Sequence, residues 1–280
     1  MADLRELQSI LGQPSDQRLA ALAAFAPKVS DPATREATVA ALLGLIAEGV
    51  GAPRDRLAAG EALALLGDPR LRTPDQADYW VKVETDDGAV HFGRFPVTNA
   101  EYRRWVDAGG YETGPWTAEG RAWLSKCSDP WPVRSKAADA APYIIDNQPV
   151  VGVTWFEADT YARAHGARLP RFDERVCAVR GKEKRPYPWG SPFGEGHANT
   201  QEEVLQKPCA VGLYRSDVTP EGLFDLAGNV AEWAGDGAGD QYWYAPGAFD
   251  EPSMAAWAKA REIARPDARW RSSGFRLAKD

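Results

Sequence analysis

The chain has 280 residues, of which 44% are hydrophobic and 26% are charged, a balance that favours a folded globular protein and excludes disordered and fibrous classes. The net charge of −7 gives no general basic surface, so we expect no nucleic-acid partner. The sequence has no apolar run of about eighteen residues to span a membrane and no segment typical of a secretion signal. These features predict a cytoplasmic protein without a membrane partner.

The first part of the chain, residues 1–70, differs in composition from the rest. It is rich in Ala and Leu, whereas all eleven tryptophans come later in the chain. Leu4 and Leu7 have the spacing of one helix face, and Asp31-Pro32 is a typical helix start. Residues 55–70 resemble the closing helix of a HEAT-type repeat. We therefore predict a small all-α, HEAT-like segment, either a repeat remnant or a helical cap that docks a partner.

Residues 80–280 are predicted to form a second, larger domain. Short β-like runs such as YWVKVET and AVHFGRF alternate there with turn residues. Two helices are predicted, over 98–108 and 155–165, with Thr98 as the N-cap of the first. Helices among many short strands indicate an α+β fold class.

The three cysteines form no CxxC pair and no even set for a disulfide framework. Cys127, Cys177 and Cys209 are therefore predicted to be buried free thiols in a reducing compartment.

Sequence motifs of the second domain carry a family resemblance. In chain order they are FPVTNAEYRRWVDAGGY (95–111), NQPVVGVTWFEADTYARAHGARLPRFDERVCAVRG (147–181), YPWG (187–190), GLFDLAGNVAEW (222–233) and GFRLA (274–278). Together they resemble the formylglycine-generating-enzyme, or sulfatase-modifying-factor, superfamily over roughly residues 80–280. The resemblance implies a C-type-lectin-like fold, in which the motif tryptophans Trp155, Trp189 and Trp233 would support long ordered loops.

The best-known members of that superfamily oxidise a substrate cysteine with two cysteines of their own that bind copper(I). Counting back from Gly274 without gaps, the family's Arg and Pro-Asp landmarks fall on Arg261 and Pro266-Asp267. The two cysteine positions are then Ala248 and Ser253, and neither side chain is a thiolate, the ligand that copper(I) selects. The resemblance therefore implies a divergent member, and copper is not expected.

A second branch of the superfamily, the ergothioneine-type sulfoxide synthases, uses non-haem iron held by histidines, partly from an added helical bundle. This chain has only His91, His165 and His197, and no two of them have an HxxxH spacing. Iron is therefore not expected either.

The motif GLFDLAGNVAEW contains a calcium-binding loop in the better-studied oxidases. Asp225 and Glu232 could supply carboxylate oxygens, and the carbonyls of Gly228 and Val230 could complete an oxygen shell of the kind that Ca²⁺ prefers. The alternative is that both carboxylates hydrogen-bond the turn. Calcium is the predicted cofactor.

The leading functional prediction is a non-catalytic module that binds a protein or peptide ligand, as a sensor or regulatory component of a bacterial multi-protein system that contains an NTPase or protease. Aromatic and arginine side chains are typical of binding hot spots, and Trp257 and Arg261 are one helical turn apart, as a stacked pair would be. Two alternatives remain: an oxidase of the formylglycine-generating or iron-oxygenase type with atypical ligands, and a structural subunit. The candidate ligand-binding residues are Tyr242, Trp243, Tyr244, Trp257, Arg261, Trp270 and Arg271.

Overall fold

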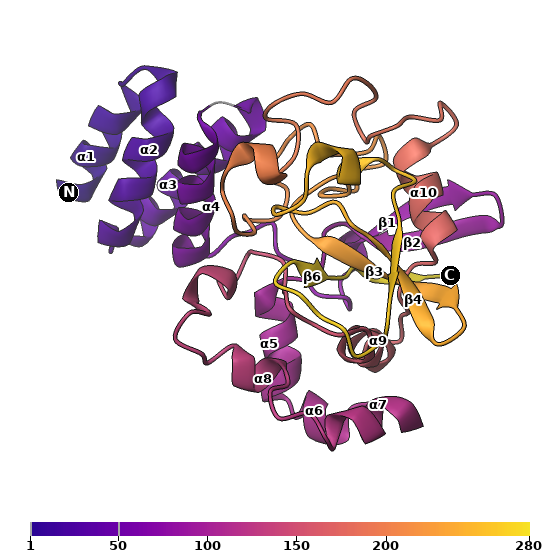
Figure 1. Ribbon diagram of the computed structural model, residues 1–280. Coiled ribbons are helices and arrows are strands. Elements are labelled where there is room, and N and C mark those ends of the chain that lie inside the picture. Colours follow the sequence, from indigo (N-terminus) through magenta and orange to yellow (C-terminus); the bar gives the residue numbers. More distant parts are fainter. Residues whose placement is uncertain (1, 50) are drawn as a thin grey trace.

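The computed structural model describes residues 2–49 and 51–280. Four helices at the N-terminus stand beside a larger domain of short strands, short helices and long loops (Figure 1). No helix in the described part of the chain is both long and apolar enough to cross a membrane. The predicted α+β class, with a helical segment ahead of a sheet-containing domain, is confirmed.

The N-terminal helices pack around one apolar core. Asp31 caps α3, because its carboxylate accepts a hydrogen bond from the Thr34 N–H at 2.8 Å, and Pro32 occupies the first turn. Leu19, Leu22 and Leu63 are completely buried in this core. The helices are α1 (Ala2–Leu11), α2 (Ser15–Phe25), α3 (Pro32–Glu48) and α4 (Pro53–Leu66), with a 3₁₀ turn η1 (Ala26–Lys28) after α2.

The helical core continues into the second domain through residues 205–214. Leu213 and Tyr214 belong to the same buried cluster as the helix leucines. Gly60 of α4 lies so close to this segment that a Cβ there would come within 2.7 Å of the Ala210 Cβ. One face of α4 is therefore covered by its own chain.

Polar contacts fix the same interface. The buried guanidinium of Arg56 pairs with Glu203 at 3.4 Å and lies over the ring of Tyr214, whose hydroxyl donates to Glu203 at 2.8 Å. The Asn147 amide donates to the Gly60 carbonyl at 2.8 Å. Because buried polar groups need such partners, these contacts specify how the helical segment sits on the domain.

Two small sheets form the centre of the second domain. The first has the order β1-β2-β7, all antiparallel, and consists of β1 (Trp80–Thr85), β2 (Gly88–Gly93) and β7 (Ala278–Lys279). The second has the order β5-β4-β3-β6, antiparallel except for the parallel β3–β6 pair. Its strands are β3 (Ala231–Ala238), β4 (Gln241–Ala245), β5 (Glu262–Ala264) and β6 (Ser273–Gly274).

The two helices predicted for this domain are confirmed as α5 (Asn99–Asp107) and α9 (Trp155–Ala164). Each begins with a capping box, in which Thr98 pairs with Glu101 and Thr154 with Glu157. The helix α10 was not predicted; its nine residues follow Pro170 without a clear apolar period. The remaining elements are α6 (Gly110–Thr113), α7 (Ala118–Leu124), α8 (Trp131–Arg134), α10 (Phe172–Arg180), η2 (Ala77–Tyr79), η3 (Ala141–Tyr143), η4 (Gln201–Glu203) and η5 (Ser253–Ala256).

Aromatic side chains fill the core between α5, α9 and the second sheet. Tyr102 and Tyr161 are completely buried and stack at 5.4 Å, and Phe275 packs edge-on against both rings. The indole N–H of Trp155 donates to the Ala234 carbonyl, and that of Trp233 donates to the Val153 carbonyl. These motif tryptophans thus tie loops and strands together, as aromatic residues with a polar handle do.

Candidate ligand-binding cleft

The predicted calcium loop is held by arginine side chains. Arg276 donates to the Glu232 carboxylate from Nε and from Nη2, at 2.9 and 2.7 Å, and Arg175 adds a third contact at 3.2 Å. The Glu232 oxygens are therefore committed to guanidinium groups. Arg276 also donates to the Asp225 backbone carbonyl at 3.2 Å, so one guanidinium group contacts both the Glu232 carboxylate and the backbone of the loop. The calcium shell of Asp225, Gly228, Val230 and Glu232 is not the arrangement that the structure has.

Two buried carboxylates organise the backbone of this loop. Asp217 accepts hydrogen bonds from the N–H groups of Leu226, Ala227 and Gly228, and Asp225 accepts one from the Gly212 N–H at 2.8 Å. Burial raises the pKa of Asp217 to about 6, and burial together with the charge of Asp217 raises the pKa of Asp225 to about 7. The alternative to calcium was that Asp225 and Glu232 hydrogen-bond the turn; instead Asp225 accepts from Gly212, outside the motif, and the N–H groups of the turn donate to Asp217.

The two positions that match the family's cysteines lie in the loop after β4. Ala248 is completely buried, and Ser253 opens the turn η5. The Ser253 N–H donates to the Glu202 carboxylate at 2.8 Å. Burial opposes ionisation of Glu202, but hydrogen bonds from Thr200 and Ser253 outweigh it and lower the pKa of Glu202 to about 2. Glu202 therefore accepts hydrogen bonds that hold this segment as a carboxylate, and its contact with Ser253 is to the backbone N–H.

The aromatic residues predicted to bind a ligand divide between the two faces of β4. Tyr242 stacks on Trp155 at 3.7 Å, and Tyr244 packs against Trp270 at 4.5 Å. These side chains border the main aromatic core and are only half-exposed. Trp243 points to the opposite face, as alternation along a strand requires. Tyr242, Tyr244 and Trp270 therefore form a partly buried group, separate from Trp243.

The predicted stacked pair of Trp257 and Arg261 is wrong. No helix runs through these residues; the turn η5 ends at Ala256. The Arg261 guanidinium instead lies 4.3 Å from the ring centre of Trp243, whereas Trp257 is 46% exposed. Arg271 pairs with Asp250 at 2.9 Å. Four of the seven predicted residues thus lie outside the group of Tyr242, Tyr244 and Trp270: Trp243 with Arg261, and Trp257 and Arg271 each apart.

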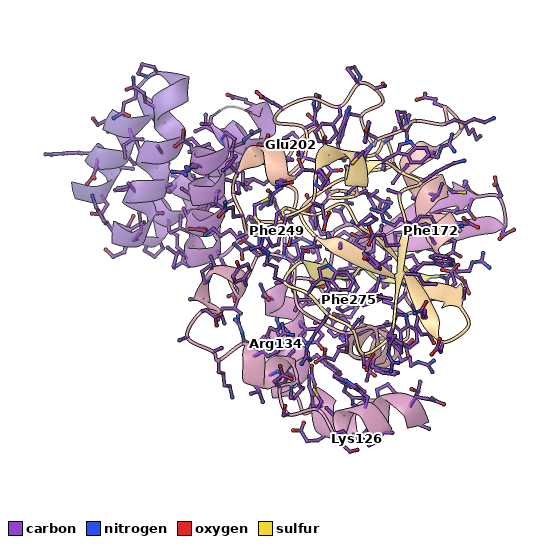
Figure 2. All side chains as sticks on the ribbon, in the orientation of Figure 1. Lys126, Arg134, Phe172, Glu202, Phe249 and Phe275 are labelled. Atoms are coloured by element: carbon purple, nitrogen blue, oxygen red, sulfur yellow. The ribbon has the colours of Figure 1, made fainter. Side chains whose placement is uncertain are left out.

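A surface hollow lies elsewhere in the domain. It is an open cleft of about 370 Å³, within the range of protein sites for small ligands or short peptide segments. Lys126, which lines the cleft, lies at the bottom of the view in Figure 2. Glu202, the neighbour of Ser253, lies at the top. The cleft is lined by Ala122, Trp123, Lys126, Cys127, Phe156, Arg265, Pro266 and Asp267.

Three chain segments build this cleft. The first contains α7, which Thr117 caps by accepting the Gly120 N–H, and which places Trp123 5.7 Å from the ring centre of Phe156 in α9. The second segment is α9, which carries Phe156. The third segment, residues 265–267, follows β5 and is fixed by the pairing of β5 with β4. Arg269 joins the first segment to the third through an ion pair with Asp129. Hydrogen bonds, strand pairing and an ion pair therefore fix the backbone on both sides of the cleft.

The charge of the cleft is mixed. Arg265 pairs with Asp267 at 3.1 Å, and both side chains are well exposed. Lys126 forms no ion pair with any of the described residues. The Cys127 sulfur lies 3.9 Å from the Arg269 Nη1. Cys127 and Cys177 are free but only partly buried, so the prediction of buried thiols is confirmed for Cys209 alone.

The three histidines do not come together. The His165 ring packs on Tyr161 and its Nδ1 contacts the Tyr161 carbonyl, whereas His197 stacks on Trp189. His91 lies in β2. Within residues 2–49 and 51–280, no three His, Cys, Asp or Glu side chains are grouped so that they could hold a metal ion. The three histidines of this chain therefore do not form a shared set of ligands.

Residues 81–280 match the Sulfatase-modifying factor enzyme 1-like domain family, so the fold and motifs define a domain of the formylglycine-generating-enzyme type. The chain belongs to this family.

The relatives include enzymes with different names. The chain is 34% identical over 160 residues to a hercynine oxygenase of Mycolicibacterium thermoresistibile; the match covers 52% of this chain and 35% of that protein. It is 35% identical over 119 residues to the formylglycine-generating enzyme of Streptomyces coelicolor, covering 38% of this chain and 35% of the relative. The chain thus spans about a third of the length of these relatives.

A solved structure of PvdO from Pseudomonas aeruginosa has the same fold. It superposes with a TM-score of 0.51 over 69% of this chain and 81% of PvdO, at 22% identity.

The cofactor prediction needs correction. Three hercynine oxygenases, which are iron-dependent, match at 32–34% identity, and they overturn the prediction that iron is not expected in a protein of this kind. The predicted calcium is not shown either.

The cleft residues were not among the predicted site residues. Trp123 and Phe156 stand in helices whose apolar faces point to the core, and the sequence gives no sign that their outer edges meet residues 265–267. A usable signal was the presence of two aromatic and two cationic side chains between α6 and α8, namely Trp116, Arg121, Trp123 and Lys126.

Proposed function

We propose that the chain is a ligand-recognition module of the sulfatase-modifying-factor family, and that it binds a protein or peptide partner in the cleft between α7 and residues 265–267. The observation that carries this proposal is the cleft itself, which has two accessible aromatic rings, a free cation and a fixed frame. Buried aromatic anchors surrounded by polar groups are the usual basis of peptide recognition.

The residues at the family's cysteine positions also support a recognition role. Ala248 offers no ligand atom in its side chain, and the neighbour of Ser253 is a weakly basic carboxylate. The module would act as a sensor or regulatory component of a bacterial multi-protein system, with an NTPase or protease among its partners. In such a system the helical segment could contribute a second docking surface, although one face of α4 is already covered.

A second candidate is an oxygenase, because the hercynine oxygenases match more than half of this chain. In that branch part of the iron site comes from a helical bundle, whereas the helical segment here contains no histidine.

One experiment separates the two candidates. The purified chain is applied to an array of synthetic peptides, and oxygen uptake is recorded with hercynine and iron(II), and with a cysteine-containing peptide and copper(I). Saturable binding of a subset of peptides without oxygen uptake supports the recognition module. Oxygen uptake with either mixture, together with no peptide binding, supports the oxygenase and overturns the first proposal.

A further inference from the structure

The cleft combines an aromatic wall with positively charged side chains, in a protein whose net charge is −7. We propose that it selects an acidic peptide segment that carries an aromatic side chain. This inference rests on the proposed recognition function and adds the chemistry of the partner. The cleft lies away from Ser253 and Glu202, so it is separate from the family's cysteine positions (Figure 2).

The aromatic preference follows from two half-buried rings. Trp123 and Phe156 both line the cleft, and neither is fully covered by the protein. Their rings are 28° from parallel, and Trp116 extends the group with its ring centre 6.1 Å from that of Trp123. A ligand ring or apolar side chain that covers them gains dispersion and removes apolar surface from water.

The acidic preference follows from the charges around the cleft. Lys126 has no partner in the described structure, and the exposed pair of Arg265 with Asp267 is of a kind that contributes little, so a ligand carboxylate can compete for Arg265. Exposed cations beside the aromatic wall can bind a ligand carboxylate while the wall contacts an adjacent aromatic side chain of the ligand.

Two further arginines lie on the same side of the molecule as the cleft. Arg269 contacts Cys127, and burial together with the charge of Arg269 lowers the pKa of Arg134. In Figure 2, Arg134 lies on the same lower side of the molecule as Lys126. Their nearest carboxylates are already engaged: Asp129 pairs with Arg269, and Glu157 accepts from Tyr111 and from the Trp131 N–H.

The same charge pattern argues against nucleic acid as the occupant. Arg265 pairs with Asp267 and Arg269 pairs with Asp129, so these two aspartates offset positive charge that a run of phosphates would need. A peptide can place single carboxylates beside Lys126 and avoid both aspartates. The open shape of the cleft also allows a chain to enter and leave it.

The test uses the full chain and three capped, fluorescein-labelled peptides. The first alternates glutamate with tryptophan; the second has lysine in place of each glutamate, and the third has serine in place of each tryptophan. Fluorescence anisotropy gives the dissociation constants. We expect the first peptide to bind at least about tenfold more tightly than the other two, and its affinity to fall as salt is added.

Variants connect the binding to the cleft. Lys126→Glu should weaken binding of the first peptide about tenfold or more, because it reverses the charge of the lysine that lines the cleft. Trp123→Ala should weaken it by a similar factor. Lys259→Glu is the matched control, an exposed lysine outside the cleft, and should change the dissociation constant less than about twofold. Lys126 is exposed, so its replacement leaves the fold intact.

Cys127 supplies a second readout within the cleft. The first peptide should slow iodoacetamide labelling of Cys127, measured by mass spectrometry, and leave labelling of the partly buried Cys177 unchanged. Protection of Cys127 by the lysine peptide instead would overturn the acidic preference and leave the recognition function standing. If no peptide protects Cys127, this cleft is not the binding site. If oxygen uptake is also observed, the recognition function fails as well.

Discussion

Arg276 and Glu232 form a completely buried ion pair at 2.7 Å, and they are 44 positions apart in the chain. The side-chain exposures are 0% and 1%. The same guanidinium donates to the carbonyls of Phe224 and Gly93, so it joins the loop before β3 to the end of β2. Removing one partner of such a pair leaves a buried charge and unsatisfied carbonyls.

Arg276→Met is therefore expected to lower the free energy of unfolding by about 3–5 kcal/mol. Arg265→Met is the control, because its ion pair with Asp267 is exposed and should cost about 1 kcal/mol or less. Urea denaturation followed by tryptophan fluorescence measures both. Equal losses for the two variants would contradict the buried network.

Glu101 gives the stability of the protein a specific pH dependence. Burial, opposed by hydrogen bonds from Thr98, raises the pKa of Glu101 from 4.5 to about 7. Between these values the folded protein holds a proton that the unfolded chain has released, so the free energy of unfolding falls as the pH rises. The contribution of one such group is at most about 1.4 kcal/mol per pH unit.

The variant Glu101→Gln keeps the shape of the capping box but cannot ionise. Its unfolding free energy should fall less than that of the wild type between pH 4.5 and about pH 7. The pKa values of Asp217 and Asp225 are also raised, so part of the fall in unfolding free energy with pH remains in both the wild type and the variant. Denaturation curves across this pH window measure the difference. Parallel curves would show that Glu101 is already ionised in the folded state.

The interface of the helical segment can be probed with two glycines. Gly60→Ala should destabilise the protein, because the new Cβ would be 2.7 Å from the Ala210 Cβ and the packed segment must shift. Gly44→Ala, at an exposed helix position with open space around it, should stabilise by about 0.5–1 kcal/mol. Thermal unfolding compares the two. If both variants gain stability, α4 does not rest on residues 205–214.

Two tryptophans of the predicted binding surface should behave differently on substitution. Trp270→Ala is expected to cost at least about 2 kcal/mol, because its ring packs against Trp233 and Tyr244. Trp257 is 46% exposed, so Trp257→Ala should cost less than about 1 kcal/mol. Chemical denaturation measures both values. Similar small losses would mean that Trp270 is surface and not part of the packed group.

Local patterns predicted much of the fold. The capping residue Thr98 and the apolar periods of the first helices act over a few neighbouring residues, and α3, α5 and α9 begin where these patterns indicate. The order of the motifs predicted the family, and residues 81–280 match it. The pair of Trp257 with Arg261 failed because helical spacing was assumed where η5 ends and an extended strand follows.

The predicted calcium loop shows what a short sequence motif does not predict. The residue types of GLFDLAGNVAEW fit an oxygen shell, but the partner that Glu232 has in the fold is Arg276, whose position the motif does not encode. From the sequence alone, a carboxylate that binds a metal cannot be distinguished from one that pairs with a guanidinium group. The choice between them depends on which cation the rest of the chain brings within hydrogen-bond distance.

The sequence by itself determined the helical segment, the α+β domain and the family, because caps, apolar periods and motif order are properties of short stretches of chain. Only the tertiary structure decided which side chains form a cleft. Trp123, Phe156 and Asp267 come from three segments more than thirty residues apart, and their meeting depends on how α7, α9 and β5 pack. Long-range packing depends on the shape and volume of all the side chains together, which no local pattern records.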